Sequence, residues 1–77
     1  MLLSFADVID RFGGPAGYAR EVGMERGTAK QARRRNSISA DWFSATARAA
    51  ERKGFDDIDE AALAELAERR RTSPVAA

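Results

Sequence analysis

The sequence predicts an all-α fold, a small domain of five helices. Apolar residues recur at the i, i+3, i+4, i+7 spacing of one helix face, and glycines and capping residues separate the helical segments. No segment alternates apolar and polar residues as a half-buried strand would. The 77 residues suffice for one domain. We assign residues 1–71 to it and residues 72–77 to a flexible C-terminal tail.

The first two helices are marked by their ends. Ser4 can cap the first helix, and the glycines 13–14 end it. Its buried face comprises Phe5, Val8, Ile9 and Phe12. The second helix starts at Pro15, because proline is favoured in the first turn, and it ends at Gly23. It is therefore only about two turns long.

The third helix contains the most basic stretch of the chain, GTAKQARRRN. Ala29 and Ala32 are its only apolar residues, and Asn36 suits a left-handed end. Two signals disagree about its start. A capping box headed by Thr28 favours a start near Ala29, whereas the short turn after the second helix favours a start near Arg26. We expect the earlier start.

The last two helices follow the same logic. Ser39 is the expected N-cap of the fourth helix, Gly54 ends it, and Trp42 is expected in the core. Asp57 or Asp59 caps the fifth helix. Its apolar residues should complete the core and also contribute to a dimer interface, because so small a domain gains stability by association. The interface candidates are Leu63, Leu66 and Ala67.

The composition argues against several classes of function. The chain has no cysteine and no histidine, so it lacks disulfides, thiolate metal sites and the commonest general base. No convergent carboxylate pair replaces them. We therefore expect no enzyme activity, no metal and no cofactor. The sequence contains no apolar run of membrane-spanning length and no signal peptide pattern, so we expect a cytoplasmic protein.

The positive charge is concentrated in one segment. The net charge is only +1, yet residues 25–37 carry five cationic residues against one acidic residue. Such a local excess is typical of one anionic contact surface. Two short helices joined by a glycine turn also describe a helix-turn-helix, whose second helix enters the major groove of DNA. The sequence therefore predicts binding to double-stranded DNA.

Helical phase identifies the residues that would read the bases. If Ala29 and Ala32 face the core, the side chains around Lys30 and Arg34 face outward at 100° per residue. Lysine and arginine suit guanine, and glutamine suits adenine. The expected base contacts are Lys30, Gln31 and Arg34, together with Arg26, Thr28 and Gly27, whose missing side chain allows close approach.

Other residues are expected to hold the DNA backbone. Arg33 and Arg35 diverge from the outward face, where they suit phosphates and also complement the dipole at the helix end. The backbone amides of Ala16 and Gly17, in the first turn of the second helix, can also bind a phosphate.

The segment RFGGPAGYAREVGMERGTAKQARRRNSISADWF resembles the Cro/repressor-like, or lambda-repressor-like, helix-turn-helix regulators of bacteria and phages, particularly the small YdaS-like type. The resemblance spans residues 5–53. It is carried by the sequence positions Phe12-Gly13-Gly14, Ala19, Val22-Gly23, Arg33-Arg34-Arg35 and Ile38. The chain departs from the family pattern at Ala29 and Ala32, where larger residues are usual, and at Ser39, where proline is usual. The resemblance implies a homodimer that represses transcription from a palindromic operator.

Two alternatives share the fold. The chain could be an antitoxin or a phage-encoded inhibitor that binds a protein through the acidic region 54–68. It could also be an excisionase-like protein that bends DNA. Substitution of Lys30 and Gln31 separates a DNA reader from a protein binder, because only the reader should lose sequence discrimination.

Overall fold

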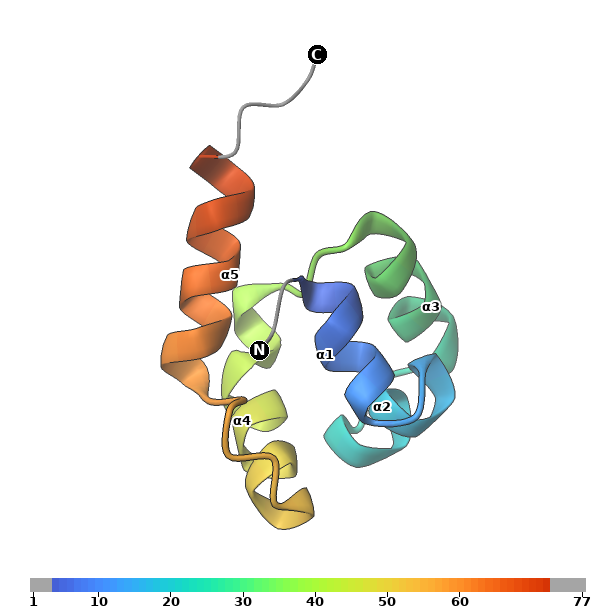
Figure 1. The fold of residues 1–77 in the computed structure, drawn as a ribbon. Coiled ribbons are helices and arrows are strands. Elements are labelled where there is room, and N and C mark those ends of the chain that lie inside the picture. The colour runs from blue at the N-terminus through green and yellow to red at the C-terminus, as the bar shows by residue number, and fades with distance from the viewer. Residues whose placement is uncertain (1–3, 73–77) are drawn as a thin grey trace.

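The computed structural model describes residues 4–72 and confirms a small, all-helical fold, with no strand in that range. It contains five α-helices and one short 3-10 turn (Figure 1). The elements are α1 (Phe5–Arg11), α2 (Pro15–Val22), α3 (Arg26–Arg35), η1 (Ala40–Trp42), α4 (Phe43–Lys53) and α5 (Glu60–Thr72). Residue 72 therefore belongs to a helix, and the rest of the expected tail, 73–77, lies outside the described residues.

The helix ends follow the capping residues of the sequence. The Ser4 hydroxyl accepts a hydrogen bond from the Asp7 amide at 3.2 Å, and the Asp59 carboxylate accepts one from the Ala62 amide at 2.7 Å. Asn36 takes the left-handed conformation, with φ 54°, and ends α3. Asp59 rather than Asp57 therefore caps α5.

The structure settles where α3 begins and shows that α4 begins later than predicted. The third helix begins at Arg26, so the earlier start is confirmed and Thr28 lies inside α3. Ser39 caps the 3-10 turn η1 by accepting from the Asp41 amide, and α4 begins only at Phe43. The chain thus turns once more between α3 and α4 than the sequence signals suggest.

The core is formed by apolar side chains from every α-helix and from the connections between them. It comprises Phe5, Val8, Ile9, Phe12, Tyr18, Ala19, Met24, Ala29, Ile38, Ala49, Ala50, Ile58, Leu63 and Leu66. Trp42 is only half-buried and packs against this core from its edge. Inside the core, the Tyr18 hydroxyl and the Thr46 hydroxyl are 2.7 Å apart and hydrogen-bonded, which links α2 to α4.

The structure places two of the three dimer-interface candidates of α5, Leu63 and Leu66, in the core of the chain. Leu63 is fully buried and Leu66 is 4% exposed, so both side chains are used within the monomer. A side chain that is already buried offers no apolar area to a second copy. Of the three candidates, Ala67 alone retains partial exposure.

Contacts between distant segments close the fold. Arg11 at the end of α1 forms two hydrogen bonds with Asp57, at 2.8 and 3.0 Å, and its guanidinium lies 5.0 Å from the centre of the Phe55 ring. The hydrogen bonds from Arg11 lower the pKa of Asp57.

Among residues 4–72, no helix has the length and apolar character needed to cross a membrane.

Candidate functional site

The third helix is held on the domain by small residues. Ala29 is fully buried, Ala32 is partly buried, and α3 packs against α2 and α1. The connection from α2 is short, because Gly23 adopts a left-handed conformation with φ 79° and Met24 inserts into the core. Two alanines and a tight turn therefore leave most of the helix circumference open to solvent.

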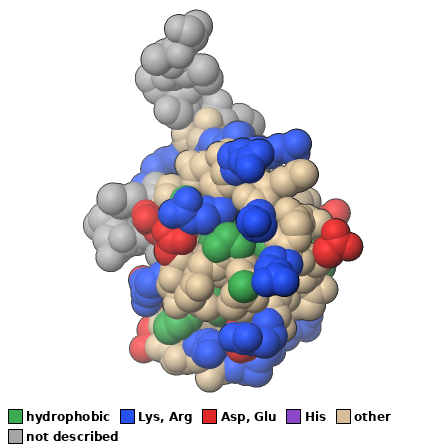
Figure 2. Space-filling view, turned by 90° about the vertical axis from the view of Figure 1, so that its right-hand side faces the viewer, with side chains coloured by type: hydrophobic (Ala, Val, Ile, Leu, Met, Phe, Trp, Pro, Cys, Tyr) green, Lys and Arg blue, Asp and Glu red, His purple; other side chains and the backbone are tan. Residues whose placement is uncertain are grey.

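The outward face of α3, defined as Gly27, Lys30, Gln31 and Arg34, is exposed along its whole length. It carries no acidic side chain. Figure 2 views the side of the molecule that α3 forms in Figure 1, and lysine and arginine side chains spread over it while the acidic ones lie mostly toward its margins. The structure thus brings together the central residues predicted to read bases.

One flank of α3 is tied to α1. The Arg33 Nε and Nη2 atoms donate to the two carboxylate oxygens of Asp10, at 2.7 and 2.9 Å. The hydrogen bonds from Arg33 lower the pKa of Asp10, and those bonds raise the pKa of Arg33. Both side chains remain about half exposed, at 46% and 47%. Arg33 therefore has an intramolecular partner that its spacing in the sequence did not suggest.

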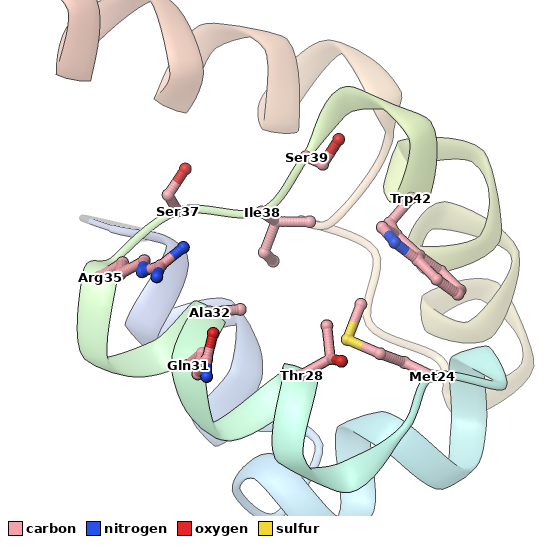
Figure 3. Close-up of a pocket in the computed structure, with 9 residues that line it drawn as sticks. All are labelled: Met24, Thr28, Gln31, Ala32, Arg35, Ser37, Ile38, Ser39 and Trp42. Carbon is pink, nitrogen blue, oxygen red and sulfur yellow. The ribbon is translucent and has the colours of Figure 1, made fainter.

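The other flank of α3 borders a groove of about 250 Å³. Thr28, Gln31 and Arg35 line it from the helix, and Ile38 and Trp42 line it from the following connection (Figure 3). Within residues 4–72 the Arg35 guanidinium has no ion-pair partner, although the Arg35 carbonyl accepts a hydrogen bond from Arg70 at 3.3 Å. Arg26 is exposed at the start of the helix.

The two residues of α2 whose backbone amides are predicted to bind a phosphate differ in exposure. Ala16 is an exposed residue in the first turn of α2. Gly17 is buried, and a Cβ atom placed there would collide with the Phe12 carbonyl oxygen. The glycine is therefore required for close packing between the end of α1 and the start of α2, a role that its position near a helix start did not reveal.

Asn36 is a further residue whose role the sequence only half indicated. Besides ending α3, it accepts a hydrogen bond from the Ala6 amide through its side-chain oxygen at 2.9 Å. It therefore fixes the C-terminal end of α3 against the first turn of α1. This contact joins residues 30 positions apart, so no local spacing signal could have predicted it.

The site consists of cations, amides and backbone rather than of acid–base groups. Across residues 4–72, no cluster of three or more carboxylates is placed to hold a metal ion. Comparison with known proteins gave no match, whether to a family model, to a curated protein or to a solved structure.

Proposed function

We propose that this chain is a sequence-specific regulator of transcription that binds double-stranded DNA. In this proposal α2, residues 23–25 and α3 form a helix-turn-helix, and α3 enters the major groove. The chain acts as a homodimeric repressor on a palindromic operator. The observation that supports the proposal most is the outward face of α3, whose four residues are all exposed and which is cationic and free of acidic side chains.

Each residue of the outward face suits a defined contact. Lys30 and Arg34 are donors that match O6 and N7 of guanine, and Gln31 can both donate and accept at the edge of adenine. Gly27 has no side chain, and a Cβ atom added there would meet only the Glu25 carboxylate at 3.7 Å. The backbone of α3 can therefore approach a base pair closely at this point.

The flanking residues are assigned to the DNA backbone or to the ends of the site. Arg26 and Thr28 lie in the first turn of α3 and can reach bases or sugars next to the central ones. Arg35 has an unpaired guanidinium within the described chain and suits a phosphate. Arg33 uses Nε and Nη2 for Asp10, which leaves Nη1 for a phosphate. The backbone amide of Ala16, an exposed residue in the first turn of α2, can add a contact.

The experiment that tests this proposal begins with selection of bound duplexes from a random pool, followed by titration of the selected site. Arg34→Gln should weaken binding by about 1–3 kcal/mol and relax the preference at one base pair. Arg48→Gln is the matched control, since Arg48 is also an exposed helical arginine but lies on α4. Equal losses for both variants, or failure to enrich any sequence, would contradict the proposal.

A second candidate is binding to a protein, as in an antitoxin or a phage-encoded inhibitor. It is favoured by a groove of about 330 Å³ between α4 and the connection to α5. Its acidic lining residues are Glu51, Asp56, Asp59 and Glu60. Such a groove suits a basic partner segment. The double variant Lys30→Ala/Gln31→Ala separates the candidates, because it should abolish DNA discrimination and leave binding at the acidic groove intact.

A further inference from the structure

The groove beside α3 has an apolar wall that belongs to the core. Met24 and Ile38 are 8% and 4% exposed, and Ala32 and Trp42 extend this apolar surface outward (Figure 3). The indole of Trp42 is the largest side chain in the lining and is half-buried, so part of it faces the groove. This wall can contact a ring through dispersion and aromatic interactions.

The opposite wall is polar and carries one cation. Thr28, Gln31 and Arg35 extend from α3 toward the space that Ile38 and Trp42 bound from the other side (Figure 3). Arg35 has no carboxylate partner within residues 4–72, and none of the groove's lining residues is acidic. The groove therefore combines an apolar surface with a cation that can still form an ion pair.

We infer that this groove binds a small aromatic carboxylate, with the ring against Trp42 and Ile38 and the carboxylate on the Arg35 guanidinium. The volume of about 250 Å³ lies below the range of about 300–1,000 Å³ typical of pockets for drug-sized ligands, which limits the ligand to about one ring with a short acidic chain. A planar guanidinium pairs well with a carboxylate because it offers two parallel N–H donors.

Occupation of the groove has a consequence for α3, and this part rests on the proposed function. The ligand neutralises Arg35, a phosphate candidate, and contacts Gln31, which belongs to both the groove and the outward face. Both effects oppose contact with DNA. A bound carboxylate therefore lowers the affinity for DNA, so the groove acts as an effector site.

The chain contains a natural reporter, because Trp42 is its only tryptophan. Hydrocinnamate is a suitable probe, since it has one ring and one carboxylate and does not absorb where indole is selectively excited. Its titration should change Trp42 emission to saturation. The neutral isostere hydrocinnamamide should bind more weakly by up to about fivefold, the difference expected of an exposed ion pair.

Two neighbouring arginines provide the matched variants. Arg35→Gln should remove the preference for the carboxylate over the amide, whereas Arg34→Gln should keep it, because Arg34 does not line the groove. The absence of saturable binding, equal binding of acid and amide, or equal effects of the two substitutions would overturn the inference.

A DNA titration in the presence of saturating hydrocinnamate tests the regulatory part. The wild-type chain should lose affinity, and the Arg35→Gln variant should lose less, because only the contact with Gln31 remains. A chain that binds the probe but never binds DNA would contradict the proposed function alone. A chain that binds DNA but not the probe would contradict the groove alone, so the two failures are distinguishable.

Discussion

Glycine serves opposite purposes at two positions of this small domain. At Gly17 the absence of a side chain lets α2 pack against the Phe12 carbonyl, where a Cβ atom would collide with the backbone. At Gly27 the surrounding space is open, and the nearest atom to an added Cβ is a flexible Glu25 carboxylate oxygen at 3.7 Å. Packing explains the first glycine, whereas nothing within the monomer requires the second.

Alanine substitution separates these two roles. Gly17→Ala should destabilise the chain by about 1–3 kcal/mol, as overpacking does. Gly27→Ala should stabilise it by up to about 1 kcal/mol, because alanine is the better helix former. If α3 approaches DNA at Gly27, the same stabilised variant should bind DNA more weakly. Urea unfolding and DNA titration measure the two effects; a stabilised Gly27→Ala chain with unchanged DNA affinity would refute close approach at this residue.

The ion pair between Asp10 and Arg33 occupies one of the cations of α3. Asp10→Asn removes the carboxylate that engages Arg33 and also a negative charge beside α3. Arg33 then becomes free for a phosphate, so DNA affinity should rise. The plot of log affinity against log salt concentration should steepen by up to about one unit.

Asp57→Asn is the matched control for Asp10→Asn. It also releases a doubly hydrogen-bonded arginine, but that arginine is Arg11 on α1 rather than a residue of α3. The control should leave the salt slope unchanged. A rise in affinity of the same size in both variants would show that only the net charge matters, and Arg33 would lose its assignment as a phosphate contact.

At the scale of elements, Tyr18 and Thr46 hold α2 against α4. Both side chains are fully buried, and the hydrogen bond between their hydroxyls satisfies both of them inside the core. Burial raises the pKa of Tyr18, and the hydrogen bond to Thr46 opposes this effect more weakly. The packing of α2 against α4 is therefore coupled to the ionisation of Tyr18. Since α3 packs against α2, the placement of α3 depends on the same contact.

This coupling predicts a loss of stability at alkaline pH. Because the folded pKa of Tyr18 is raised, the folded state keeps its proton when the unfolded state has lost it. The contribution of protonated Tyr18 to the free energy of unfolding is therefore complete below the unfolded pKa of about 10. It decreases as the pH rises above that value. Tyr18 is the only tyrosine, so tyrosinate absorbance reports on it alone. The titration midpoint should lie above that of a tyrosine model peptide.

Tyr18→Phe provides the control for the alkaline loss. It removes the ionisable group but leaves the Thr46 hydroxyl without this partner, which should cost about 1–3 kcal/mol near neutral pH. Its free energy of unfolding should then vary less with pH above about 10 than that of the wild type. Parallel pH profiles for the two chains would contradict the coupling, as would a titration midpoint at the model-peptide value.

The helix boundaries could be predicted because their causes are local. Ser4, Gly23, Asn36 and Gly54 each mark an end through their own conformation or side chain, and α3 begins where the short turn allows. The residues of α3 that face outward could also be predicted, because Ala29 and Ala32 mark the side of the helix that faces the core. The Asp10–Arg33 pair could not be predicted, since it joins residues 23 positions apart whose meeting depends on how α1 and α3 pack.

The same reasoning applies to α5. An apolar stripe on a terminal helix suits a core and a dimer interface equally well, and sequence spacing does not distinguish them. The structure buries Leu63 and Leu66 within the chain. The sequence spacing likewise does not distinguish a Gln31 that reads a base from one that only lines the groove, because both roles require the same exposed side of α3.

At the scale of the whole molecule, the distribution of charge matters more than its sum. The net charge of +1 provides little general attraction to DNA. The basic residues of α3 that have no ion-pair partner within residues 4–72 are Arg26, Lys30, Arg34 and Arg35. Affinity for DNA should therefore depend on this one helix, and substitutions of basic residues elsewhere should have small effects.

The dependence of affinity on salt then distinguishes one bound chain from two. Each neutralised phosphate contributes about −0.9 to the slope of log affinity against log salt concentration. If all five basic side chains of α3 neutralised phosphates, the slope would be about −4.5 for one chain and about −9 for two chains on a palindromic operator. Titration of a full operator and of an isolated half-site should give slopes that differ about twofold. Equal slopes on the two duplexes would exclude the homodimer and leave a chain that binds DNA alone. A flat salt dependence on both would exclude DNA as the partner of α3.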